Sequence, residues 1–305
     1  MTGVIQGFGV IGILIALGLG LAHAGVLDRD SQRVLSRLVY FVATPSLLVD
    51  LLARTDVSDV LGVGFAIAGL SVLAVLVVYV PVARRRGRSM SHIVIGALSA
   101  SYANGGYLGL PIAVYVLGDA AFAVPVMVLQ LIVYAPLALS MLDLEATGRR
   151  PTLGALALSG VRNPVSVAAV CGVLISVLGI HLPDLVGEPI KLLGGMAVPG
   201  ALLAYGVSLR FGGAIGTAHR REIAVIALLK LVWMPAVAYV LARFAFGLES
   251  HQVFGLTVMA ALPTAQNVFV YASRFQRSEL LARDSVAVTT LLSIPVLFGL
   301  AAVLA

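Results

Sequence analysis

Long apolar runs separated by short polar segments dominate the pattern of the chain. Residues 60–82, 120–142 and 291–305, for example, contain no Asp, Glu, Lys or Arg. A helix that crosses a bilayer needs about 20 apolar residues. Runs of this kind predict ten spans, at about 5–24, 34–53, 58–82, 91–118, 120–142, 163–181, 188–209, 221–247, 251–274 and 283–304. The pattern therefore predicts an all-α polytopic membrane protein with ten transmembrane helices.

The fourth predicted span is interrupted in its middle by the segment NGGYLGLP, which begins at Asn104. Glycine allows unusual backbone dihedrals, and proline removes a backbone donor. Backbone that leaves the helix at this depth is tolerated where it is buried in protein or lines a water-filled cavity. There the freed N–H and C=O groups, together with the ends of the half-helices, can bind polar or charged solutes.

The ninth predicted span carries a second interruption, at Pro263 within the segment ALPTAQNVFVYA. Two interrupted helices at corresponding places in inverted halves are typical of a substrate site near the bilayer midplane. The alternative is that small residues and proline serve helix packing, as they often do in membranes. We expect the substrate-binding residues among those of the two breaks: Asn104, Gly105, Gly106, Tyr107, Gly109, Pro111, Pro263, Thr264, Gln266 and Asn267.

The number of spans indicates an internal duplication. Ten is twice five, and a unit with an odd number of spans must be inverted when it is repeated. Pro45 and Pro81 recur at one constant spacing as Pro199 and Pro235. We therefore expect two inverted five-helix repeats with a cytoplasmic linker between them, at 1–142, 163–305 and 143–162 respectively.

The basic residues orient the chain in the membrane. Most Lys and Arg side chains fall in the odd-numbered loops and their flanks, whereas the even-numbered loops hold only Arg54, Lys191 and Arg243. The positive-inside rule then places the odd loops in the cytoplasm and both termini outside. A secretory signal needs a basic n-region, and residues 1–27 hold no Lys or Arg, so we expect the first helix to be retained.

Composition narrows the class of protein further. Hydrophobic residues make up 60% of the 305 residues and charged residues 11%, against roughly 25% charged in a soluble domain. The net charge of +6 is explained by cytoplasmic loop charge, so we expect no nucleic acid partner. The single Cys171 excludes an internal disulfide, and the five histidines fall near predicted span ends without metal-ligand spacing. We expect no metal and no cofactor.

The segments NGGYLGLP, LPTAQNVFVYA, YFVATPSLLV and AVPGALLAYGVSL together resemble the auxin efflux carrier family. This family includes bacterial relatives of the plant PIN transporters, within the superfamily that contains the bile acid–sodium symporters. The resemblance spans almost the whole chain. It implies a scaffold from spans 1, 2, 6 and 7, and a transport domain from spans 3–5 and 8–10 in which spans 4 and 9 cross.

The resemblance also implies a function, namely the carriage of organic acid anions, auxin-like or small carboxylates, across the inner membrane by an elevator-type motion. Pro45 and Pro199 match the scaffold prolines that face the transport domain, and a homodimer through the scaffold is compatible with it. Bile acid–sodium symporters use acidic residues near the crossover to bind sodium. This chain has none there, although backbone and amide oxygens could still bind sodium, so the coupling ion stays open.

Two ionisable residues interrupt the apolar runs, Asp50 and Lys230. Charges inside a membrane are costly and commonly functional. Asp50 is close enough to the outer end of its span to sit at the interface. Lys230 lies roughly 14 Å into span eight at 1.5 Å per residue; it could attract the anion, pair with an acidic group or titrate in a proton-coupled cycle. Tyr102, Tyr107 and Tyr205 are candidates for polar cavity walls or for aromatic packing.

Three other classes of protein are alternatives to a carrier. An intramembrane enzyme would need a nucleophile–base pair, a carboxylate pair or a His-rich metal set within the spans, and the sequence has none. A cation/proton antiporter would be expected to place aspartates at the breaks, where this chain has Asn104 and Asn267. Paired midplane breaks favour alternating access over a channel. We therefore expect a secondary transporter of organic acid anions, with a sodium- or proton-coupled carrier of another solute as the alternative.

Overall fold

The structure, a computed structural model, describes residues 2–54, 62–147, 164–180, 182–211 and 219–304. These residues are almost entirely helical, and the only extended pairing among them is one isolated bridge. Six helical stretches are long and apolar enough to cross a membrane: Arg29–Leu52, Val63–Arg85, Ala120–Glu145, Asp184–Arg210, Arg220–Ala245 and Glu279–Leu304. The chain is therefore a multi-pass membrane protein. The shorter apolar helices are Gly9–His23, Met90–Ser101 and Val167–Val177, and the ten-span count and the inverted repeat stay predictions.

The helices of the first half follow the predicted apolar runs. They are α1 (Thr2–His23), α2 (Arg29–Leu38), η1 (Val39–Ala43), α3 (Thr44–Leu52), α5 (Val63–Arg85), α6 (Met90–Ser101), η2 (Gly105–Gly109), α7 (Leu110–Tyr115), η3 (Ala120–Ala123), α8 (Val124–Val128), η4 (Leu129–Tyr134) and α9 (Ala135–Thr147). The segments η1, η2 and η4 are π-helical turns. Helix α2 begins before the predicted position 34 because the Asp28 carboxylate accepts a hydrogen bond of 2.8 Å from the Ser31 backbone N–H.

The helices of the second half are α11 (Pro164–Val177), α12 (Asp184–Gly195), α13 (Ala197–Arg210), α14 (Arg220–Leu228), η5 (Leu229–Trp233), α15 (Met234–Val240), η6 (Leu241–Ala245), α16 (Ser250–Ala260), α17 (Gln266–Phe275) and α18 (Glu279–Leu304). The segments η5 and η6 are again π-helical turns. Helix α9 extends the fifth predicted span into the predicted linker at 143–162. The rest of that linker lies outside the described residues.

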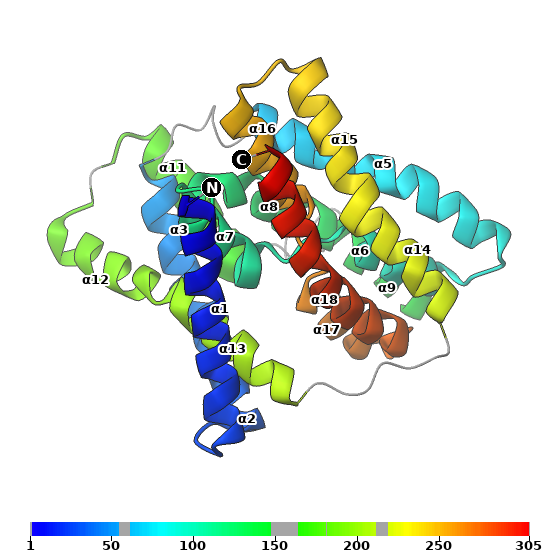
Figure 1. Cartoon of the computed structure of the whole chain (residues 1–305), viewed down its shortest axis with the longest axis horizontal. Coiled ribbons are helices and arrows are strands. Elements are labelled where there is room, and N and C mark those ends of the chain that lie inside the picture. Colours follow the sequence, from blue (N-terminus) through cyan, green and yellow to red (C-terminus); the bar gives the residue numbers. More distant parts are fainter. Residues whose placement is uncertain (1, 55–61, 148–163, 181, 212–218, 305) are drawn as a thin grey trace.

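Two groups of helices surround the interrupted segments (Figure 1). In one group α1 packs along α13, and α3 packs against α11 and α12. In the other, α5 packs against α6 and α15, and α14 packs against α18. The α1–α13 contact is close because a Cβ atom added to Gly18 or Gly206 would overlap a backbone carbonyl of the facing helix. Small residues at such positions let membrane helices approach closely.

A buried polar cluster ties three helices of the second group together at one end. The Glu222 carboxylate of α14 accepts hydrogen bonds from the Tyr79 hydroxyl of α5 at 2.9 Å and from the Arg88 guanidinium at 2.8 Å. The His92 imidazole of α6 lies 2.8 Å from the same carboxylate and 3.0 Å from the Ser278 hydroxyl. The Glu222 side chain is only 7% exposed, so these partners are what offsets the cost of burying its charge.

Candidate functional site

The two predicted breaks meet in the structure. Helix α6 ends at Ser101 and helix α16 ends at Ala260, and the chain that follows each helix runs antiparallel to the other at the bridge between Ala103 and Thr264. The Asn104 N–H donates to the Pro263 carbonyl at 2.8 Å, and the Ala265 N–H donates to the Tyr102 carbonyl at 3.0 Å. Non-helical backbone is costly in a membrane unless its polar groups are paired. The backbone of each break therefore provides hydrogen-bond partners for backbone groups of the other.

Side chains from two further helices complete this pairing. The Gln130 amide of η4 donates to the Ala103 carbonyl at 2.9 Å and accepts from the Ala103 N–H at 2.8 Å, with its orientation assigned from these partners. On the other side, the Thr264 N–H donates to the Thr289 hydroxyl of α18 at 3.1 Å. The Gln130 amide thus bonds both backbone polar groups of Ala103, as a neighbouring β-strand would do. Neither Gln130 nor Thr289 was predicted from the sequence. For Gln130 the available signal was that it is the single side-chain amide in the uncharged run 120–142.

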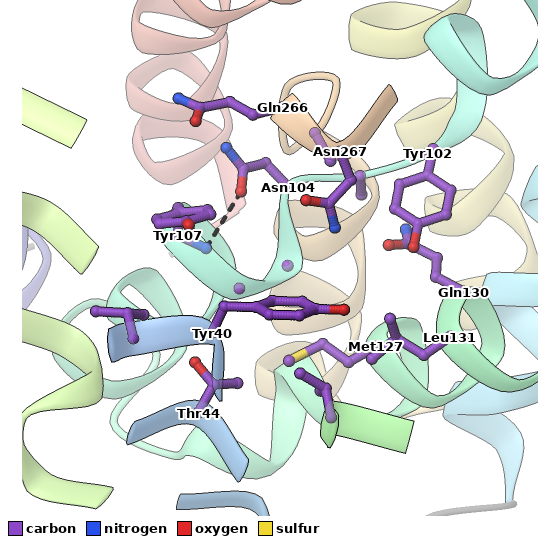
Figure 2. Close-up of a pocket in the computed structure, with 16 residues that line it drawn as sticks. Tyr40, Thr44, Tyr102, Asn104, Tyr107, Met127, Gln130, Leu131, Gln266 and Asn267 are labelled. Atoms are coloured by element: carbon purple, nitrogen blue, oxygen red, sulfur yellow. Dashed lines mark hydrogen bonds between the residues drawn. The ribbon is translucent and has the colours of Figure 1, made fainter. Parts of the chain in front are cut away.

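A cavity of about 50 Å³ lies beside the crossing (Figure 2). A water molecule needs roughly 10–15 Å³ of such space, so in this conformation the cavity has room for a few waters but not for an extended organic acid. The π-helical turns η1, η2 and η4 all contribute to its wall, in line with the frequent occurrence of such turns at functional sites. Its lining residues are Val39, Tyr40, Thr44, Tyr102, Ala103, Asn104, Gly105, Gly106, Tyr107, Met127, Gln130, Leu131, Val165, Ala265, Gln266 and Asn267.

The cavity wall is mostly apolar, with a few hydrogen-bonding side chains, and none of its lining residues is Asp, Glu, Lys, Arg or His. Its hydrogen-bonding groups are side-chain amides and hydroxyls, from residues such as Asn267, Gln266 and Tyr40 (Figure 2). Gln266 is also the first residue of α17, so the positive end of that helix dipole lies at the wall. Neutral donors and a helix N-terminus can bind an anion such as a carboxylate without placing a fixed charge in the membrane.

The side chain of Asn104 in this wall has a hydrogen-bond donor that is not used. Its side chain is 1% exposed, and its Oδ1 atom accepts a hydrogen bond of 3.2 Å from the Tyr107 backbone N–H, drawn as a dashed line in Figure 2. Its Nδ2 atom has no hydrogen-bond partner within the part of the chain that the structure describes. A buried donor left without an acceptor costs about 1–3 kcal/mol. The Asn104 amide is therefore suited to receive an acceptor oxygen from a ligand.

Six of the ten predicted substrate-binding residues line the cavity: Asn104, Gly105, Gly106, Tyr107, Gln266 and Asn267. The other four lie in or next to the crossing without reaching the wall. Pro263 and Thr264 form its backbone and side-chain hydrogen bonds. Gly109 serves close packing, since a Cβ atom there would lie 2.9 Å from Leu262 Cδ1. Pro111 is buried in the first turn of α7.

None of the five predicted supporting residues lines the cavity. Pro45 lies in the first turn of α3, and Pro199 and Tyr205 lie on α13. Asp50 of α3 pairs at 2.6 Å with Arg54, which lies just past the end of that helix. The Lys230 ammonium donates to the Ala260 carbonyl at 2.7 Å, at the end of α16. Lys230 is not among the residues that line the cavity.

No group of three or more His, Cys, Asp or Glu side chains that could hold a metal ion is found in the described part of the chain. The cavity itself offers no carboxylate, imidazole or thiol ligand. The oxygen atoms that could contact an ion there belong to side-chain amides, hydroxyls and the backbone carbonyls of the crossing. The expectation that the chain needs no cofactor stays a prediction.

Known proteins match the chain along nearly its whole length. The chain matches the family described as "Membrane transport protein" over residues 9–152 and 149–300. It is 27% identical over 296 residues to a protein of Rhizobium meliloti (strain 1021) named "Putative malonate transporter", with 92% of this chain and 90% of the relative covered. It is 24% identical over 296 residues, with the same coverage, to "Uncharacterized transporter YfdV" of Escherichia coli (strain K12).

These matches confirm the resemblance that the two break motifs predicted. They also agree with the expectation that the chain is a transporter and not an enzyme. The family match and the antiparallel crossing of the two breaks concern the same segments, since residues 103 and 264 both lie within the matched ranges. The chain therefore belongs to the membrane transport protein family, the auxin efflux carrier-like group of membrane transporters.

Proposed function

We propose that this transporter is a secondary carrier of organic acid anions, and that small dicarboxylates such as malonate are the first substrates to test. The observation that carries the proposal is the unpartnered amide donor of Asn104, buried in an otherwise mostly apolar wall whose few polar side chains are neutral, beside the N-terminus of α17. Such a wall suits a carboxylate, because neutral donors stabilise negative charge without a permanent cation in the membrane. The name of the Rhizobium meliloti relative adds support for a dicarboxylate.

In the proposed mechanism the anion binds where the two breaks cross. The Asn104, Gln266 and Asn267 amides bind its carboxylate oxygens, and Gly105 and Gly106 let the backbone approach closely. The small size of the cavity implies that the substrate enters a wider conformation than this one. We propose an elevator-type alternating access in which the group of helices around α5, α14 and α18 moves against the group around α1, α3 and α13, across the inner membrane with both termini outside.

Two features support this division of labour. The two helix groups are packed within themselves as described above, and the cavity lies where η1 of one group faces η2 and η4 of the other. Tyr40 and Thr44 therefore reach the cavity from the proposed scaffold, and Met127 and Gln130 reach it from the proposed transport domain. A site at such a boundary changes shape when the two groups move relative to one another.

The proposal is tested by reconstituting the purified protein in proteoliposomes. Charge displacement on a solid-supported membrane is recorded for carboxylates from malonate and malate to indole-3-acetate, with and without sodium and at several pH values. We expect saturable transport of one acid. Labelled-acid uptake covers electroneutral movement, which the electrical method does not detect. No transport of any acid by either method would contradict the proposal and favour a carrier of another solute or a channel.

The site assignment has its own test in the same vesicles. Asn267→Ala removes one amide from the cavity wall, and we expect it to abolish transport while expression, insertion and unfolding temperature stay at wild-type values. Gln252→Ala is the matched control, because Gln252 is an exposed amide on α16 outside the cavity. Normal transport by the Asn267→Ala protein would show that the substrate binds elsewhere.

A further inference from the structure

A groove of about 760 Å³ lies between α14 and α18, away from the crossing of the two breaks. One side is formed by residues between Arg220 and Val232, on α14 and η5, and the other by residues between Val288 and Val296 on α18. Both helices belong to stretches that can cross a membrane, and they run in the same direction (Figure 1). The groove shares no lining residue with the cavity at the crossing, so it is a separate feature of the molecule.

The groove has a buried floor and exposed walls, and both are apolar. Ile223 and Leu231 at the floor are 4% and 3% exposed, whereas Leu228 and Leu292 at the walls are 58% and 47% exposed. The small side chain of Ala224 leaves the space between the walls open. The hydrocarbon region of a bilayer contains no water, and its acyl chains are as apolar as leucine. An acyl chain is therefore the group that fits such a groove inside a membrane.

One end of the groove carries a positive charge. Arg220, the first residue of α14, is exposed and is the one charged residue among those that line the groove. In the described part of the chain its guanidinium forms no ion pair. Nearby carboxylates are engaged elsewhere, Glu222 with Tyr79 and Arg88, and Asp284 with Arg283. A guanidinium can bind two phosphate oxygens at once, so this end of the groove suits a phosphate group.

The length of the groove matches one leaflet of a bilayer. Arg220 is the first residue of the apolar stretch Arg220–Ala245, which places it at the level of the lipid headgroups. From Arg220 to Val232 a helix rises about 18 Å at 1.5 Å per residue. Half of a hydrocarbon core about 30 Å thick is about 15 Å. A lipid with its phosphate at Arg220 therefore reaches the far end of the groove with its acyl chain.

We propose that this groove binds an anionic glycerophospholipid, with the phosphate on the Arg220 guanidinium and one acyl chain between α14 and α18. Basic groups between transmembrane helices are a recurring type of headgroup site. A zwitterionic lipid with the same chains carries its own cation beside the phosphate, so its headgroup gains less from Arg220. The proposal does not depend on which solute the protein transports, because lipid binding is measured without transport.

The first experiment measures the affinity of the purified protein in detergent for dioleoylphosphatidylglycerol and for dioleoylphosphatidylcholine, by native mass spectrometry. We expect the wild-type protein to bind the anionic lipid about tenfold more tightly, and Arg220→Gln to lose this difference. Arg221→Gln is the matched control, because it removes the same charge from the next residue, which is exposed and lies outside the groove. Equal affinities of the two variants for the anionic lipid, or of the wild-type protein for both lipids, would overturn the proposal.

The second experiment fills the groove. Ala224→Phe places a large side chain between the walls, and the exposed position of Ala224 lets the helix keep its packing. We expect about tenfold weaker binding of dioleoylphosphatidylglycerol. Ala236→Phe is the control, because Ala236 is an exposed alanine of α15 outside the groove. Unfolding temperatures without lipid show that both variants fold.

Three results of the second experiment would contradict the proposal. Wild-type affinity of the Ala224→Phe protein would show that the acyl chain lies elsewhere. A rise in unfolding temperature with inorganic phosphate as large as that with the lipid would indicate an anion site without a place for the chain. A wild-type dimer in detergent that Ala224→Phe converts to a monomer would show that a second copy of the chain covers the groove.

Discussion

The Thr264 hydroxyl donates a hydrogen bond of 2.5 Å to the Ser99 carbonyl, so a side chain from one interrupted helix caps the last turn of the other. Both residues are fully buried. The Ser99 carbonyl is one of the carbonyls that a helix end leaves without a helical partner. Because the same threonine also donates its backbone N–H to Thr289, it joins three helical segments at the crossing.

Replacing Thr264 by valine keeps the shape of the side chain and removes its donor. The Ser99 carbonyl would then be buried without this hydrogen bond, which costs about 1–3 kcal/mol. We expect Thr264→Val to lower the free energy of unfolding by this amount and to reduce transport, as measured by unfolding in mixed micelles and by vesicle uptake. Thr264→Ser, which keeps the hydroxyl, should remain close to wild type. Equal stability of the serine and valine proteins would contradict the role of this hydrogen bond.

Asn104→Asp separates the two functions of that side chain. The aspartate keeps an acceptor for the Tyr107 N–H, so the first turn of η2 stays capped. It replaces the free Nδ2 donor with negative charge, which repels a carboxylate. We expect a lower unfolding temperature, because the buried carboxylate has a donor at only one oxygen, and a transport rate lower by about tenfold or more, measured as uptake of the labelled acid. Wild-type uptake with this variant would show that the Asn104 amide does not contact the substrate.

Gln130→Leu tests the support that this amide gives to the first break. Leucine is apolar and leaves the Ala103 N–H without an acceptor, whereas the Ala103 C=O still accepts a hydrogen bond of 2.8 Å from the Gly105 N–H. A buried donor left without an acceptor costs about 1–3 kcal/mol, so we expect a lower unfolding temperature and loss of transport. Gln130→Glu retains only the acceptor and should fall between the two. A leucine variant as stable as the wild-type protein would show that the Gln130 amide does not stabilise the first break.

The close contact between α1 and α13 predicts different responses of two glycines on one helix. A Cβ atom at Gly18 would overlap the Leu203 carbonyl of α13, whereas a Cβ atom at Gly20 would meet nothing within 4 Å. We expect Gly18→Ala to destabilise the protein by about 1–3 kcal/mol through overpacking. Gly20→Ala should be neutral or slightly stabilising, because alanine favours helix. Both are measured as shifts in unfolding temperature, and equal shifts would contradict this helix packing.

The carboxylate of Glu222 predicts a stability difference between buried and exposed ion pairs. Glu222→Ala leaves the Arg88, His92 and Tyr79 side chains without their shared acceptor, and loss of a buried partner costs about 3–5 kcal/mol. Arg33→Ala is the control, since Arg33 and its partner Asp30 are 70% and 81% exposed and such pairs contribute about 1 kcal/mol or less. Similar unfolding temperatures of the two variants would show that the cluster does not stabilise the fold.

The local features of the crossing could be predicted from the sequence. Glycine and proline inside an apolar run mark where a membrane helix must break, and the amides beside them mark polar capacity at that depth. Asn104, Gln266 and Asn267 therefore appear in the cavity wall as expected. The contribution of Tyr40 and Thr44 could not be predicted, because they lie on a helix that reaches the cavity only through its packing against the crossing.

Lys230 is a second case in which the sequence indicated a residue but not its contacts. Its depth in an apolar run indicated a functional charge, but not which group it would contact. The partner turned out to be a backbone carbonyl, and a carbonyl leaves no trace in the amino-acid sequence because every residue has one. The Gln130–Ala103 contact is of the same kind, a side chain bound to backbone atoms of a distant segment.

The amino-acid sequence alone was sufficient to predict the features that a bilayer imposes on each segment of the chain separately. Apolar run length, breaks in the runs and the absence of acidic residues at the breaks led to a helical membrane transporter with its polar groups at two interruptions. The pairing of Ala103 with Thr264, the closure by Gln130 and Thr289 and the placement of Lys230 at the end of α16 required the folded chain. Hydrogen bonds depend on distances between atoms of different helices, and the packing of the whole molecule sets those distances.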